Sequence, residues 1–203
     1  MHVSIPMSLI SRLIPRYAEP HRRYHTWHHI AEVFDASERI SNDKSLELTL
    51  AILFHDAVYA PLSKTNEEDS ARLLQDEGKR AGIGEDVLLD ASWLVLQTKH
   101  LATAFFTETA SSLSRRPRAD VLLDSDLSIL GSDPKTFDLY EDAIRQEYSM
   151  VPDAQFASGR ATIMKNFLES PMIFMTDRGR ELWEKQAREN LKRSLERWKG
   201  QIQ

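Results

Sequence analysis

The feature that most constrains the fold is the run Leu50-Ala-Ile-Leu-Phe-His-Asp-Ala-Val-Tyr59, an apolar helix-like segment that ends in an imidazole beside a carboxylate. A helix that is apolar nearly all round belongs at the centre of a protein. Burying a polar group there without a partner costs roughly 2–7 kcal/mol, and more for a charge. A bound cation at His55 and Asp56 would remove this cost, so the run predicts a central helix that carries metal ligands.

Apolar residues recur at helical spacing along almost the whole chain. The spacing predicts helices over 6–17, 30–40, 44–55, 65–79, 86–98, 119–131, 134–150, 154–168 and 181–199. The Thr- and Ser-rich stretch 103–114 predicts a surface loop, and there is no convincing strand. We therefore expect residues 1–203 to form a single all-α domain, a bundle of about seven to nine helices.

Composition narrows the functional classes. The 203 residues include no cysteine, which excludes disulfides, thiolate zinc sites and cysteine nucleophiles. A formal net charge of −5 gives no overall signal for nucleic acid. The beginning of the chain lacks the pattern of a signal peptide, and no apolar stretch is long enough to cross a membrane. We expect a cytoplasmic protein with no membrane partner. A homodimer is compatible with the sequence, which does not require one.

Histidine and aspartate residues gather at the ends of apolar helices or inside them. The candidates are His25, His28, His29, His55, Asp56, His100, Asp124 and Asp126. Neighbouring helical residues point about 100° apart, so His55 and Asp56 can share one ion only in a crevice between helices. For His25 and His28, packing or the orientation of a true ligand is the alternative interpretation.

Seven blocks follow one another along the chain: Tyr24-His-Thr-Trp-His-His-Ile30, Phe54-His-Asp-Ala-Val-Tyr59, Asn66-Glu-Glu-Asp-Ser-Ala71, Thr98-Lys-His100, Leu123-Asp-Ser-Asp-Leu-Ser-Ile-Leu-Gly131, Ile144-Arg-Gln-Glu-Tyr148 and Ala187-Arg-Glu-Asn-Leu191. Their order resembles the HD superfamily of metal-dependent phosphohydrolases, and a bacterial branch known as predicted HD phosphohydrolases in particular. The resemblance covers nearly the whole chain.

The resemblance implies that four residues are the metal ligands: His29, His55, Asp56 and Asp126. His29 is preferred to His28 because it directly precedes Ile30, and Asp126 is preferred to Asp124 because it precedes the Leu-Ser-Ile-Leu run. Two imidazoles and two carboxylates favour a divalent transition ion (Mn, Fe, Co, Ni or Zn) over Mg or Ca.

Residues near the implied metal site are candidates for catalysis and substrate binding. Glu67 or Glu68 would orient or deprotonate a water molecule, although acids are also common at the start of a helix. Arg22, Arg23 or Lys99 would contact a substrate phosphate. His100 would bind a phosphate or a second metal ion, or cap the preceding helix.

The expected activity is hydrolysis of a phosphate ester or anhydride, in a small phosphorylated substrate such as a nucleotide, by metal-activated water. Loops 57–65 and 101–117 are expected to set the specificity. One alternative is a binuclear-iron oxygenase or lyase of the same fold. Another is a ligand-binding or regulatory protein in which the metal is structural.

Overall fold

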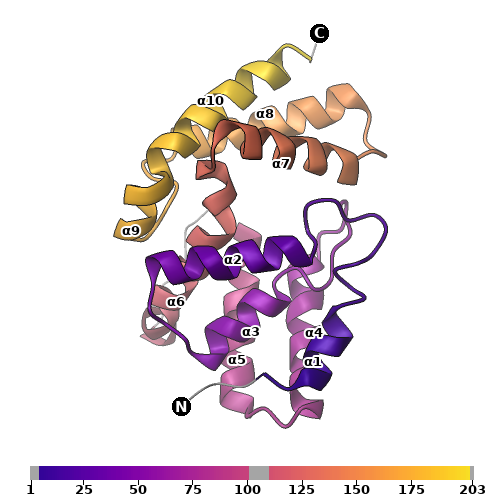
Figure 1. Cartoon of the computed structure of the whole chain (residues 1–203), viewed down its shortest axis with the longest axis vertical. Helices are drawn as coiled ribbons and strands as arrows, with labels where there is room; N and C mark the ends of the chain where they lie inside the picture. Colours follow the sequence, from indigo (N-terminus) through magenta and orange to yellow (C-terminus); the bar gives the residue numbers. More distant parts are fainter. Residues whose placement is uncertain (1–4, 101–109, 202–203) are drawn as a thin grey trace.

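The computed structural model describes residues 5–100 and 110–201, and for 100 and 110–113 it describes only the backbone. All regular secondary structure in this part of the chain is helical (Figure 1). The α-helices are α1 (Met7–Leu13), α2 (Trp27–Ile40), α3 (Leu46–Phe54), α4 (Asn66–Arg80), α5 (Glu85–Gln97), α6 (Ala110–Asp126), α7 (Pro134–Glu147), α8 (Asp153–Glu169), α9 (Asp177–Gly179) and α10 (Lys185–Lys199).

Short helical turns of other types complete the described fold. They are the 3₁₀ turns η1 (Thr98–His100) and η2 (Leu127–Gly131), and the π-helical turn η3 (Arg180–Glu184). Because η3 joins α9 to α10 without a break, the described residues form 9 helices. The prediction of an all-α bundle is therefore confirmed.

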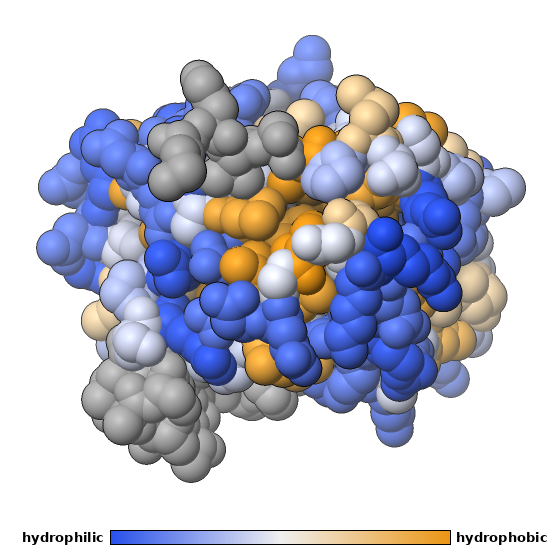
Figure 2. Space-filling view, turned by 90° about the horizontal axis from the view of Figure 1, so that it is seen from below, coloured by the Kyte–Doolittle hydropathy of each residue, from blue (hydrophilic) through white to orange (hydrophobic). Residues whose placement is uncertain are grey.

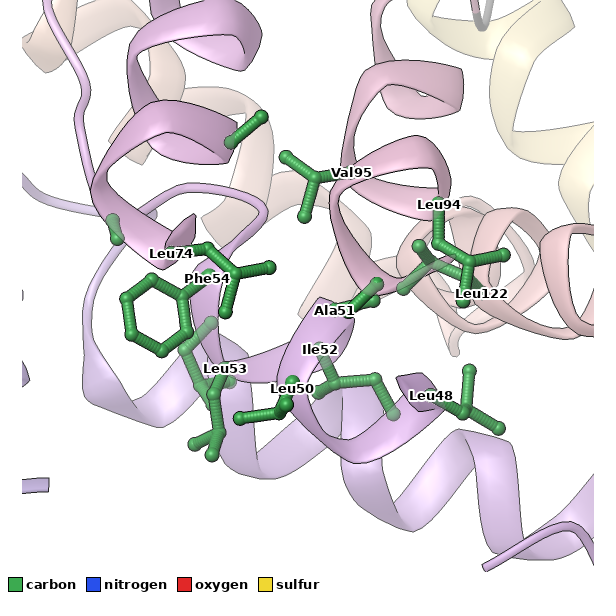
Figure 3. Packing of buried hydrophobic residues seen from close by; sticks show 14 of the residues in the cluster. Leu48, Leu50, Ala51, Ile52, Leu53, Phe54, Leu74, Leu94, Val95 and Leu122 are labelled. Carbon is green, nitrogen blue, oxygen red and sulfur yellow. The ribbon is translucent and has the colours of Figure 1, made fainter. Parts of the chain in front are cut away.

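The central helix is α3, as its apolar sequence predicts. The Ser45 hydroxyl caps it by accepting from the Leu48 amide. Its side chains pack against Leu74 of α4, Leu94 and Val95 of α5, and Leu122 of α6 (Figure 3). Leu50 and Phe54 are completely buried. Truncating such a leucine to alanine typically costs ~2–5 kcal/mol, so α3 is the main anchor of this core.

The helices gather at two ends of the molecule. In Figure 1, α1, α3, α4 and α5 lie at one end and α7, α8 and α10 at the other, with α2 between them. The second end has its own apolar clusters, which include Phe137, Trp183 and Leu191 in one and Phe156 with Trp198 in the other. Since α2 contacts the first end and Ala36 belongs to the Phe137 cluster, α2 joins the two ends.

A buried carboxylate attaches the final helix to α6. Asp124 accepts hydrogen bonds from the Met175 and Thr176 amides at 2.7 and 2.8 Å, and from the Thr176 hydroxyl at 2.6 Å. Gly179 passes so close that an added Cβ would lie 2.5 Å from Asp124 Oδ2. Asp124 is therefore a structural residue of this junction.

Part of the predicted loop 103–114 is helical in the structure. Helix α6 begins at Ala110, within the stretch predicted to be a loop, and it contains Pro117. An interior proline removes one helical hydrogen bond and crowds the preceding turn, yet α6 continues through Pro117.

On the face seen in Figure 2, hydrophobic residues collect near the centre and hydrophilic residues surround them. Among the described helices, none has both the length and the hydropathy that a membrane span requires.

Candidate metal centre

Three helices bring four side chains to one point between the two ends of the molecule. His29 lies in the first turns of α2, His55 and Asp56 follow the end of α3, and Asp126 is the last residue of α6. Apolar neighbours bury both imidazoles almost completely, while the carboxylates are partly exposed. All four residues that the family resemblance implies as ligands meet here.

The potential ligand atoms are close together. The Nε2 atoms of His29 and His55 are 3.1 Å apart. Asp56 Oδ2 lies 3.1 Å from His55 Nε2 and 3.5 Å from His29 Nε2. Asp126 Oδ1 lies 3.2 Å from His29 Nε2 and 3.6 Å from His55 Nε2. His29, His55 and Asp126 form the group of potential ligands found in the described residues.

The hydrogen bonds of His55 suit a metal ligand. Its Nδ1 lies 2.9 Å from the Ile52 carbonyl oxygen, which can only accept. This contact places a proton on Nδ1, and in the neutral ring it leaves the lone pair of Nε2 directed at the cluster. The donor set therefore fits a divalent transition ion.

The charges in the cluster depend strongly on one another. Burial would lower the pKa of His55, but the charges and hydrogen bonds of Asp56 and Asp126 together outweigh it and raise the pKa well above its usual value. Burial would also lower the pKa of His29, but hydrogen bonds to Asp126 and Asp56 raise it above its usual value. Without a metal, protonated imidazole balances the carboxylates, and a divalent cation would replace that proton.

The pKa values of the two carboxylates, Asp56 and Asp126, shift in the opposite direction. Burial would raise the pKa of Asp56, but the charges of His55 and His25 lower it well below its usual value. Hydrogen bonds from His29 and His55 likewise outweigh burial and lower the pKa of Asp126. Both aspartates are therefore anionic near neutral pH.

A buried glutamate that the sequence analysis did not select organises the chain before α2. Glu147 Oε1 accepts from the backbone amides of residues 23, 24 and 25 at 2.7, 2.8 and 3.0 Å. Its Oε2 contacts His25 Nδ1 at 2.6 Å and the Tyr59 hydroxyl at 2.8 Å. The block Ile144-Arg-Gln-Glu-Tyr148 was the only sequence signal for this role.

Arg22 is also structural, so the expectation that it contacts a phosphate is wrong. Its guanidinium is buried and donates to the carbonyl oxygens of His25, Asp56 and Ala57. It also pairs with Glu19 at 2.9 Å. These contacts connect the segment before α2 to the residues that follow α3.

Beside the cluster is a cavity of about 480 Å³. The site residues His55, Asp56 and Asp126 form part of its wall. Loop 57–65 contributes Pro61 and Leu62 to the wall, and its role in specificity stays a prediction. The opposite wall comes from α7, α8 and the turn between them, which the sequence analysis did not connect with the site.

The predicted catalytic and substrate-binding residues do not all line the cavity. Glu67 lines the cavity, whereas Glu68 pairs with Lys99, which also donates to the Lys64 carbonyl oxygen at 2.7 Å. Arg23 is exposed, and its guanidinium donates to the carbonyl oxygens of residues 20 and 22. The side chain of His100 and residues 101–109 lie outside the described residues, and residues 110–117 of the expected specificity loop belong to helix α6.

The choice between neighbouring candidates agrees with the geometry. His28 is exposed and lies 3.4 Å from Glu32, away from the cluster that contains His29. Asp124 accepts hydrogen bonds at the start of the final helix, whereas Asp126 contacts both imidazoles.

Comparisons with known proteins identify no family for this chain. No protein-family model matches the chain, and neither curated proteins nor solved structures include a significant match.

Proposed function

We propose that this protein is a metal-dependent phosphohydrolase that cleaves a phosphate ester or anhydride. The observation that supports it best is the convergence of His29, His55, Asp56 and Asp126 beside a cavity, whose wall includes the last three of them. Packing alone gives no reason to collect two buried imidazoles and two carboxylates there, because their charges must be compensated.

The donor set would hold Mn, Fe, Co, Ni or Zn through His29, His55, Asp56 and Asp126. When bound, the ion would polarise a phosphoryl oxygen and acidify a water molecule. The chain orients the ligands through the Ile52 carbonyl oxygen on His55 and through the helix ends that carry the aspartates.

Glu67 is the better placed of the two predicted catalytic acids. It stands at the start of α4 and lines the same cavity as Asp56. From that wall its carboxylate would orient a water molecule and take up a proton. Glu68 is less suited because its carboxylate pairs with the Lys99 ammonium.

The test is hydrolysis of a broad panel of phosphate esters and nucleotides by protein loaded separately with each of the five ions. We expect turnover with at least one ion. Glu67→Gln is expected to lower kcat by about 10²–10⁴-fold, the usual contribution of a general base, without loss of metal. Glu68→Gln is expected to have a smaller effect. Absence of turnover across all ions and substrates would refute the proposed function.

A further inference from the structure

The wall of the cavity opposite the metal cluster is mostly apolar. Helix α8 contributes one face, formed by two adjacent pairs four positions apart and one further residue: Gln155 with Phe156, Gly159 with Arg160, and Ile163. Helix α7 and the following turn add Tyr140, Ile144, Tyr148 and Val151. An apolar wall facing a small polar cluster is the usual composition of a small-molecule site.

Gly159 has no packing reason to be glycine. It lies inside α8, where glycine is less favourable than alanine. A Cβ added to Gly159 would meet no atom within 4 Å, so close contact with a neighbour does not exclude a side chain. Its φ is not positive, so the backbone does not require glycine either. The consequence of glycine at this position is a wider cavity.

The cavity offers little positive charge for a highly charged ligand. Among its described lining residues, Arg160 is the one with a permanent positive charge. The Arg160 guanidinium already pairs with the buried Glu141 carboxylate, which also accepts from Ser194 and Trp198 at 2.7 and 2.6 Å. A divalent ion would balance Asp56 and Asp126, and Glu67 adds a further negative charge.

Some of the polar lining residues already have backbone partners. The Asn66 side chain pairs with the amide and the carbonyl oxygen of Ala60, each at 3.0 Å. The Thr98 hydroxyl donates to the Val95 carbonyl oxygen at 2.8 Å. These two groups hold the protein together and are not available to recognise a strongly polar ligand.

From these observations we infer the substrate class: a phosphomonoester with a single phosphate and an apolar or aromatic alcohol part, which lies against Gly159. The inference rests on the proposed function and deepens it. The single phosphate meets the metal cluster, and the alcohol part occupies the apolar wall. A triphosphate would bring negative charges that no described lining group compensates.

The test compares ligands that differ in the apolar part and, separately, nucleotides that differ in the number of phosphates. Binding of 3-phenylpropylphosphonate and ethylphosphonate, which cannot be hydrolysed, is measured by calorimetry on the metal-loaded protein. Hydrolysis of the corresponding 3-phenylpropyl and ethyl phosphates is measured in parallel, and AMP is compared with ATP. Each measurement is made on wild type, Gly159→Ala and Gly159→Leu, in which the leucine fills the space beside α8.

We expect wild type to bind the phenylpropyl compound at least about tenfold more tightly than the ethyl compound, which corresponds to ~1.4 kcal/mol. Gly159→Leu is expected to remove this preference, Gly159→Ala to retain most of it, and AMP to be preferred to ATP. Equal binding of both phosphonates by wild type, or an unchanged preference in Gly159→Leu, would overturn the inference. Selective phosphonate binding without any hydrolysis would instead refute the proposed function and leave the binding preference established.

Discussion

Glu147→Ala is expected to destabilise the fold strongly. The Glu147 side chain is fully buried, and its carboxylate accepts hydrogen bonds from three backbone amides, the His25 ring and the Tyr59 hydroxyl. Truncation leaves these donors without their acceptor in a place that water does not reach. Removing one partner of a buried charged pair typically costs about 3–5 kcal/mol. In a chain of this size each kcal/mol lowers Tm by ~2–4 °C, so the expected loss is about 6–20 °C.

The matched control is Asp142→Ala on the same helix. Asp142 pairs with Arg197 at 2.8 Å, and both side chains are about half exposed. Exposed pairs contribute only about 0–1 kcal/mol, so this control should melt close to wild type. Urea unfolding followed by circular dichroism measures both variants. A Glu147→Ala variant within about 1 kcal/mol of the control would refute the assigned role.

The same residue predicts a pH dependence. Although burial would raise it, the pKa of Glu147 is lowered to about 2 by the hydrogen bond and charge of His25 and by backbone amides. Because the folded-state pKa is lower than the ordinary value, the stabilisation is present above that ordinary value and disappears as the pH falls toward 2. The difference in the free energy of unfolding between wild type and Glu147→Gln, measured by urea unfolding, should therefore become smaller as the pH falls toward 2. A difference that widens as the pH falls would contradict the assignment.

Three further outcomes are expected. Gly179→Ala should lower Tm, because the new Cβ would lie 2.5 Å from Asp124 Oδ2; an unchanged Tm would contradict this contact. Gly159→Ala should stabilise the fold by ~0.5–1 kcal/mol in urea unfolding, and destabilisation would show that the site is packed. In metal-free protein, Asp56 raises the pKa of His55 against the effect of burial, so stability should fall as the pH rises through that raised pKa. Melting curves that are independent of pH from neutral to alkaline conditions would refute this coupling.

The sequence was sufficient to predict the central helix and the cluster. The segment that forms α3 is apolar nearly all round, and this pattern has few interpretations other than burial. His29, His55, Asp56 and Asp126 came from the family resemblance, and the structure brings them together. That resemblance remains a prediction, as do the metal and the activity.

Other parts of the site depend on contacts that sequence spacing does not encode. Glu147 acts on residues about 120 positions earlier, and an acid in an amphipathic helix usually faces solvent. Gly159 and Arg160 matter only because α8 packs across from the loop after His55. Sequence alone does not distinguish an arginine that contacts a phosphate from one that, like Arg22, donates to buried carbonyl oxygens.

The most direct test of the metal centre is elemental analysis of protein purified without chelator, for wild type, Asp56→Ala and the control His28→Ala. His28 is exposed and lies outside the cluster, whereas Asp56 contacts both imidazoles. We predict about one transition ion per chain in wild type and His28→Ala, and its loss in Asp56→Ala. No bound ion in wild type after reloading, or an equal ion content in Asp56→Ala, would contradict the account.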